Sequence, residues 1–219
     1  MSMKTAITNE TFEAIVLGSR RLKEQDRIVM FLAKGYGRFD AVAYGGHKSS
    51  SRWAGKLEPF TVLNVSCQRK GNSGLWIAKE AEVLEQYHPE DDWRRFIILQ
   101  AAAELSILAT PSEGMESETY EVCIGFGASV MKNEEPLAVL LAYVFHWSWR
   151  SGFGLPDMNV NERMRQFMEH AVVNGPDSWA RYKFKDKKVA MQLLTAARNH
   201  VEECTEREWK SGAMLNRVL

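Results

Sequence analysis

The chain has 219 residues, of which 45% are hydrophobic and 26% charged, and its formal net charge is zero. This composition suits one large domain or two small ones and excludes a disordered chain. No apolar run approaches the roughly 18 residues that span a bilayer, and the N-terminal residues lack the charged-then-apolar pattern of a signal peptide. We therefore expect a cytoplasmic protein without a membrane segment. The three cysteines are widely spaced and give neither a disulfide framework nor a zinc-binding pair.

Turn residues divide the first 87 residues into short segments that are typical of β-strands. Residues 11–19 are rich in β-formers, and residues 26–46 contain two strands joined by a glycine-bearing turn. Residues 61–68 alternate with a period near two, and a second glycine-bearing turn separates them from a last strand-like segment. About five strands in this length predict a small β-barrel, and the pattern fits both the OB type and the SH3-like type.

The periodicity becomes helical after an acidic, proline-bearing junction near residue 88. The first helix is expected to begin with Asp91 or Asp92 as its cap and to bury Trp93 and Phe96. The third helix, residues 137–149, is apolar on nearly every side, and Pro136 occupies its first helical position. The fourth helix, residues 189–204, is expected to pack against the third. The four expected helical segments cover residues 93–108, 120–130, 137–149 and 189–204.

These patterns predict an α+β protein with two domains. The predicted boundaries are 1–87 for the barrel domain and 88–219 for the helical domain. Residues 157–188 mix helical, turn and basic pieces and give no clear pattern. The barrel domain holds 13 Lys and Arg against 9 Asp and Glu, a net charge of +4, and the helical domain therefore carries −4. This asymmetry indicates where a polyanion would bind.

The most basic stretch is the predicted loop at residues 44–60, which lies between two strands. It holds Lys48, Arg52 and Lys56 and has no acidic residue before Glu58. Each of these cations can replace a condensed counterion on a phosphate. Trp53 either stacks on a base or packs against the barrel, and on spacing alone a solvated loop explains the pattern equally well. Further cations, at the first inter-strand turn, extend the patch if the barrel brings the turns together: Arg20, Arg21 and Lys23.

Catalytic and metal-binding patterns are absent from the sequence. The five histidines do not fall into a metal-ligand spacing, and no nucleophile elbow, phosphate loop or dinucleotide fingerprint is present. His146 lies within the apolar third helix and is expected to be a core group. A second basic cluster, residues 181–188, is expected to be a charged edge strand or a solvated turn. We therefore expect no enzyme activity, no metal and no cofactor.

Three stretches carry a family resemblance. The basic loop contains Tyr44-Gly45-Gly46, His47-Lys48, Ser51-Arg52, Gly55, Leu57 and Glu58-Pro59-Phe60, the last predicted strand reads LWIAKEAEVLEQY, and the apolar helix with its turn reads LAVLLAYVFHWSWRSGFGLPD. In these features the chain resembles the RecO family of bacterial recombination-mediator proteins, strongly to about residue 87 and loosely beyond it. Two features depart from the family pattern. Tyr44 replaces a lysine, and the four-cysteine zinc module of many members is missing, so we expect no zinc.

The resemblance implies an OB-fold joined to a helical domain, with no catalytic residues. Such proteins bind single- and double-stranded DNA and anneal complementary strands. With the partner RecR they help to load the RecA recombinase onto DNA coated by single-strand-binding protein, whose C-terminal tail is a further expected partner. RecA is thus an indirect partner, and the resemblance also implies a cytoplasmic, nucleoid-associated location.

Two functions follow as hypotheses. The first is a DNA-binding recombination mediator whose contact face is formed by Arg20, Arg21, Lys23, Arg38, Lys48, Arg52 and Lys56. These assignments rest on charge and loop position. The second is a non-catalytic protein-interaction adaptor in the repair pathway, with weak or no direct DNA binding. The negative charge of the helical domain leaves room for this alternative.

Overall fold

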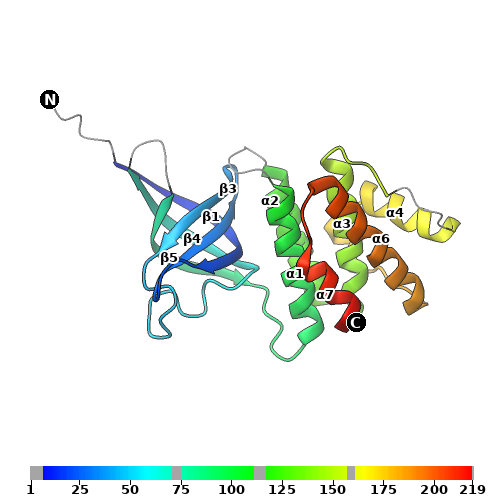
Figure 1. Ribbon diagram of the computed structural model, residues 1–219, viewed down its shortest axis with the longest axis horizontal. Helices are drawn as coiled ribbons and strands as arrows, with labels where there is room; N and C mark the ends of the chain where they lie inside the picture. The colour runs from blue at the N-terminus through cyan, green and yellow to red at the C-terminus, as the bar shows by residue number, and fades with distance from the viewer. Residues whose placement is uncertain (1–6, 71–74, 111–116, 157–160, 219) are drawn as a thin grey trace. The chain divides into compact units, whose positions relative to one another are not determined.

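The computed structural model describes residues 7–70, 75–110, 117–156 and 161–218 (Figure 1). Within these ranges five strands precede seven helices. The strands are β1 (Ile7–Arg21), β2 (Arg27–Ala33), β3 (Gly37–Ala43), β4 (Thr61–Lys70) and β5 (Trp76–Gln86). The helices are α1 (Trp93–Ala109), α2 (Ser117–Lys132), α3 (Pro136–Arg150), α4 (Glu162–Val173), α5 (Pro176–Trp179), α6 (Lys187–Thr205) and α7 (Lys210–Val218). The predicted α+β class is confirmed.

The five strands close on themselves in the hydrogen-bonded order β1-β2-β3-β5-β4 and back to β1. We call this arrangement the strand ring. Neighbouring strands are antiparallel except β3 and β5, which pair in parallel over Ala41–Ala43 and Trp76–Ala78. The long strand β1 pairs with two other strands: its first half pairs with β4 and its second half with β2. The pairing of β1 with β2 shifts in register between Val16 and Gly18, just after the last β1–β4 pair at Ile15.

Alternate side chains of the strands point into the ring and form its core. On β4 these are Leu63, Val65 and Cys67, all buried. On β1 the outward-facing Ile15 and Leu17 are buried as well, at 0% and 1% exposure. Strands buried on both faces lose the alternation of apolar and polar residues. This explains why residues 11–19 appear β-rich without a clear period of two.

The helical part is organised around α3, whose residues from Ala138 to Ser148 are all buried. Pro136 occupies the first turn of this helix, as predicted, where its missing N–H costs nothing. Helices α1, α4 and α6 each pack against α3, which confirms the predicted pairing of the fourth helical segment with the third. The expected burial of Trp93 and Phe96 is wrong. Their side chains are 50% and 39% exposed because the buried part of α1 begins only at Ile98.

Several polar contacts fix the ends of these helices. The carboxylate of Asp92 accepts hydrogen bonds from the backbone N–H groups of Arg94 and Arg95, so Asp92 is the cap of α1. Asn133, which is 1% exposed, follows α2. Its amide donates to the carbonyl oxygens of Trp179 and Tyr182, both at 3.0 Å. Asn133 thereby holds the segment after α5 against the end of α2.

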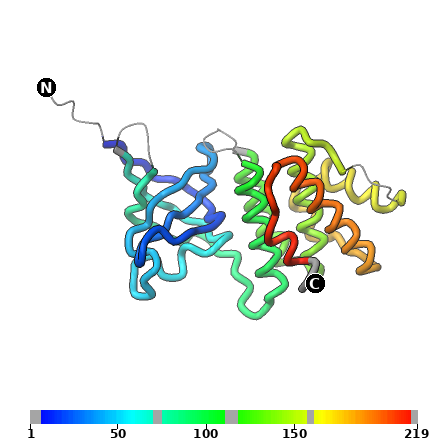
Figure 2. Tube along the Cα trace, in the orientation of Figure 1, coloured from blue at the N-terminus to red at the C-terminus, as the bar shows by residue number. Residues whose placement is uncertain are grey.

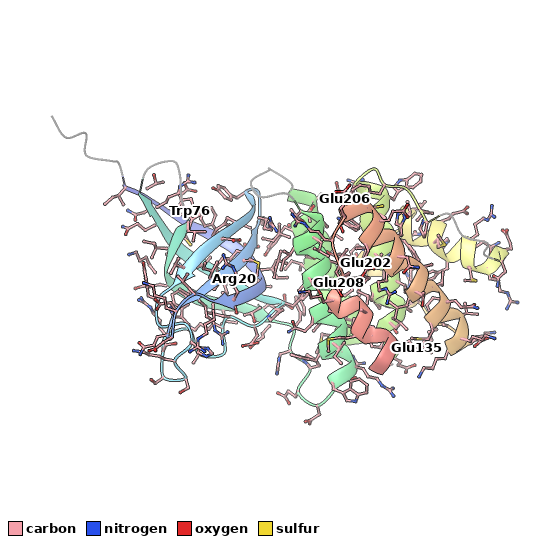
Figure 3. The ribbon with its side chains drawn as sticks, viewed as in Figure 1. Arg20, Trp76, Glu135, Glu202, Glu206 and Glu208 are labelled. Carbon is pink, nitrogen blue, oxygen red and sulfur yellow. The ribbon has the colours of Figure 1, made fainter. Side chains whose placement is uncertain are left out.

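The N-terminus of α7 is satisfied by carboxylates from two other helices. Glu104 on α1 accepts from the backbone N–H groups of Lys210 and Ser211 at 3.2 and 2.8 Å. Glu202 on α6, which is labelled in Figure 3, accepts from the N–H of Trp209 at 3.1 Å. Free N–H groups and the positive end of the helix dipole favour such anionic partners. This arrangement fixes the start of α7 through residues distant in sequence.

Gly125 on α2 marks a close helix contact. A Cβ atom added at Gly125 would lie 2.5 Å from the Cβ of Pro176, closer than two carbon atoms approach in proteins. The sequence alone suggests that this glycine only weakens the helix. The structure shows that it allows α5 to lie against α2.

The chain divides into two compact units. The first comprises Met1–His88 with Thr110–Glu121, and the second comprises Pro89–Ala109 with Val122–Leu219. The predicted boundary at residues 87 and 88 stays a prediction. Among the described residues no helix is long and apolar enough to cross a membrane.

His146 is a buried core group of α3, as predicted, and makes the helical part sensitive to acid. Its Nδ1 lies 3.3 Å from the carbonyl oxygen of Ala171, and its Nε2 is buried without a hydrogen-bond partner in the described part of the chain. Burial lowers the pKa of His146 from its usual 6.5. The neutral form therefore dominates in the folded state at neutral pH.

We expect the stability that depends on neutral His146 to be complete above pH 6.5 and to be lost as the pH falls below that value. The unfolded chain takes up the proton more readily there, so protonation favours unfolding. Chemical denaturation followed by far-ultraviolet circular dichroism between pH 7.5 and 5 measures this loss. In His146→Gln the pH slope should be smaller by up to about 1.4 kcal/mol per pH unit. An unchanged slope in the variant would contradict this assignment.

Candidate nucleic-acid interface

The connection between β3 and β4, residues 44–60, is a succession of tight turns that we call the basic loop (Figure 2). Backbone N–H groups donate to the carbonyl oxygens three residues earlier, from Lys48 to Gly45 and from Ser51 to Lys48. The pattern repeats from Ala54 to Ser51. Gly45 and Gly55 have φ angles of +70° and +71°, a conformation that favours glycine. The loop therefore has a defined shape of its own.

Three apolar side chains anchor the basic loop to the strand ring. Trp53, Leu57 and Phe60 are exposed by only 1%, 2% and 0%. The indole Nε1 of Trp53 donates to the carbonyl oxygen of Tyr44 at 3.0 Å, which satisfies the polar atom of this buried ring. The sequence leaves open whether Trp53 meets a base or packs inward. The structure shows that it packs inward.

The turn between β1 and β2 is bonded to the start of the basic loop. The carboxylate of Asp26 accepts from the backbone N–H of Gly45 at 2.9 Å. The N–H of His47 donates to the carbonyl oxygen of Gln25 at 2.9 Å. The guanidinium of Arg27 lies 3.2 Å from Nδ1 of His47. These contacts bring the two turns together, which is the arrangement that a shared basic surface requires.

Five of the predicted contact residues lie on these two turns or the adjoining end of β1, and all five are exposed: Arg20, Arg21, Lys23, Lys48 and Arg52. The guanidinium of Arg21 donates to the carbonyl oxygens of Lys23 and Glu24, which orders the β1–β2 turn. The guanidinium carbon of Arg52 lies 5.4 Å from the centre of the Trp53 ring. In the described part of the chain neither Lys48 nor Arg52 has an acidic partner. Their charge is available to an anion.

The other two predicted contact residues are placed differently. Lys56 is half-buried, and its Nζ donates to the carbonyl oxygen of Ala81 on β5 at 2.7 Å. It thereby fastens the basic loop to β5, beyond the short stretch where β5 pairs with β3. Arg38 lies near the start of β3, five residues before Ala43, which is about 16 Å along an extended strand. It is not brought together with the basic loop.

Arg27 is a residue of this surface that the sequence patterns do not single out. Its position inside a strand carries no loop signal. One end of its guanidinium donates to the hydroxyl of Ser19 at 3.2 Å and the other reaches His47. Arg27 therefore connects β1 to the basic loop and adds a further cation beside Arg21, its cross-strand neighbour.

The second basic cluster, residues 181–188, belongs to the packing of the helical part. Lys183 forms an ion pair with Glu134 at 2.6 Å, and the backbone N–H of Phe184 donates to Glu135 at 2.9 Å. The rings of Tyr182 and Phe184 lie 5.3 and 4.8 Å from the ring of Phe167. These contacts hold the start of the cluster against Glu134, Glu135 and Phe167 of the helical part.

Groups with strongly shifted pKa values do not form a reactive site. Burial raises the pKa of the Cys67 thiol to about 12. It also raises the pKa of Cys123 and of Tyr143, which lie 3.2 Å apart in the core of the helical part. All three therefore stay protonated at neutral pH and are poor nucleophiles or bases. No group of three or more potential metal ligands occurs among the residues that the structure describes.

Comparison with known proteins gives consistent matches. Residues 3–87 match the family model described as Recombination protein O N terminal. A DNA repair protein RecO from Streptomyces avermitilis is 30% identical over 140 residues, which are 60% of this chain and 56% of that protein. The RecO protein of Bifidobacterium longum is 37% identical over 137 residues, 60% of this chain and 56% of the relative. That of Syntrophobacter fumaroxidans is 26% identical over 152 residues, 69% of this chain and 58% of the relative.

The chain spans a little more than half the length of these relatives. The family model covers the whole strand ring and the basic loop, which are also the parts that carry the strongest sequence resemblance. The matches to the relatives extend beyond these elements. Residues 3–87 thus match the N-terminal domain of the RecO family, and about 60% of the chain is similar to DNA repair proteins named RecO.

Proposed function

We propose that the chain acts in DNA repair by binding the phosphate backbone of DNA through the basic loop and the β1–β2 turn. One observation carries the proposal: a hydrogen bond joins two turns that are 19 residues apart in sequence, and both turns carry exposed cations. Contacts to phosphates are independent of base sequence and leave base edges free. A surface of this kind is suited to bringing complementary strands together.

The fold of the strand ring also supports DNA binding. Its order, with one parallel pairing between β3 and β5, fits an OB-type barrel, a fold that binds oligonucleotides through its loops. We therefore propose a non-catalytic recombination mediator that anneals complementary strands. It would act in the cytoplasm at the nucleoid and help to load the RecA recombinase onto DNA coated by single-strand-binding protein. RecR and the C-terminal tail of single-strand-binding protein are its proposed partners.

Strand annealing tests this function. Two complementary labelled oligonucleotides are mixed with the protein, with and without single-strand-binding protein, between 50 and 300 mM salt. We expect faster annealing at low salt in both arms, because the cations screen phosphate repulsion. Annealing at the spontaneous rate, together with tight binding to RecR, would instead identify a protein-interaction adaptor.

A further inference from the structure

The strand ring has a second end, away from the basic loop, where aromatic side chains gather. β3 leads from Gly37, beside the β2–β3 turn, to Ala43, where the basic loop begins. Near the Gly37 end the ring of Phe12 lies 4.7 Å from that of Phe39 and 5.3 Å from that of Trp76. Tyr36 lies in the turn itself, 4.8 Å from Phe12 and only partly buried. The aromatic rings thus fill this end of the ring.

Arg69 lies at the edge of this aromatic cluster. The inward-facing positions of β4 before it are apolar and buried, and Arg69 is the next position on the same face. Its guanidinium carbon lies 4.4 Å from the centre of the Trp76 ring, which is 2% exposed. An arginine therefore covers the aromatic core where an apolar residue would be expected. Figure 3 labels Trp76 among the strands.

The hydrogen-bonding state of Arg69 is unusual for a partly buried cation. Its Nε atom is buried and has no hydrogen-bond partner among the residues that the structure describes. In the described ranges no acidic side chain pairs with its guanidinium. A buried donor without an acceptor destabilises the folded protein, and buried charges are normally paired. Nε is the only nitrogen of this guanidinium that is buried in this way, so an anionic ligand would meet the two terminal nitrogens.

We propose that Arg69 is a contact for single-stranded nucleic acid that is separate from the basic loop. It is supported by Trp76, whose ring lies 6.3 Å from that of Tyr36. A guanidinium stacked on an aromatic ring keeps its N–H edge for a phosphate and its outer face for a base. The partly exposed ring of Tyr36 offers a second stacking surface. Bases in a duplex are already stacked, so this contact favours single strands. The inference rests on the proposed function, because it assumes that the protein binds DNA.

The test compares binding of one labelled oligonucleotide as a single strand and as a duplex at 50 mM salt. Arg69→Met places a side chain of similar volume over Trp76 but removes the positive charge and the planar guanidinium group. We expect it to weaken single-strand binding about 10-fold and duplex binding less than about 3-fold. Arg69→Lys, which keeps only the charge, should show an intermediate loss. Lys79→Ala removes an exposed cation of β5 and should change both affinities less than about 2-fold.

Thermal unfolding of each variant verifies that the strand ring is intact, and Arg69→Gln replaces Arg69→Met if the latter unfolds. Equal losses for single strand and duplex, or no loss in any Arg69 variant, would overturn the Arg69 contact. With either of these outcomes, the proposed function still holds if the unchanged protein binds DNA. If the unchanged protein binds neither form of DNA, the proposed function and the Arg69 contact both fail.

Discussion

The double variant Lys48→Ala/Arg52→Ala is expected to bind single-stranded DNA about 50-fold more weakly than the unchanged protein at 50 mM salt. Both side chains are exposed, and neither has an acidic partner in the described residues, so both are available for phosphates. Removing one phosphate-binding cation makes the log–log dependence of affinity on salt shallower by about 0.7 for a single strand. The double variant should therefore lower the slope by about 1.4. Fluorescence anisotropy across a salt series measures affinity and slope together.

A matched control lies in the second basic cluster. Lys183→Ala/Lys185→Ala removes the same charge from the helical part, where Lys183 already pairs with Glu134. We expect its salt slope to equal that of the unchanged protein. If the control flattens the slope and Lys48→Ala/Arg52→Ala does not, DNA is bound by residues 181–188, and the assignment to the basic loop is wrong.

Trp53→Ala is expected to lower the free energy of unfolding by about 3–5 kcal/mol. The side chain is 1% exposed, belongs to the core of the strand ring and donates to the carbonyl oxygen of Tyr44. Its removal leaves a cavity and detaches the basic loop from the core. Urea denaturation at neutral pH measures the loss.

Trp53→Leu separates this structural role from base stacking. Leucine keeps apolar volume in the core but offers no aromatic plane. Under conditions in which the variant is folded, its affinity for single-stranded DNA should stay within about 2-fold of the unchanged protein. A stacking contact would be worth roughly 1–3 kcal/mol, or about 5- to 150-fold. A loss of that size would show that Trp53 leaves the core to meet a base.

The parts of the fold that the sequence predicts are those with a local signal. Short β-rich segments with glycine turns predict the strands, and Pro136 with its apolar run predicts α3. Helix α7 has no such signal, because its first N–H groups are satisfied by Glu104 and Glu202 from other helices. The role of Gly125 likewise depends on Pro176, about 50 residues away. Such features become visible only in three dimensions.

The candidate site divides in the same way. Composition is sufficient to identify the basic loop, since its cations lie close together in sequence. The hydrogen bond from the Gly45 N–H to the Asp26 carboxylate joins the loop to the β1–β2 turn. It forms because β2 and β3 pair and bring these two residues together. The separate position of Arg38 follows from the direction of β3. Arg69 gives no signal in sequence, because only the ring of strands places it over Trp76.

Binding of the unchanged protein to single-stranded oligonucleotides of unrelated sequence, titrated with salt, tests the central claim most directly. If Arg20, Arg21, Lys23, Lys48 and Arg52 each contact a phosphate, the logarithm of the association constant falls linearly with that of the salt concentration, with a slope of about −3.5. The slope should be the same for every sequence, since backbone contacts carry no sequence information. Undetectable binding at 50 mM salt, or an affinity independent of salt, would contradict the account.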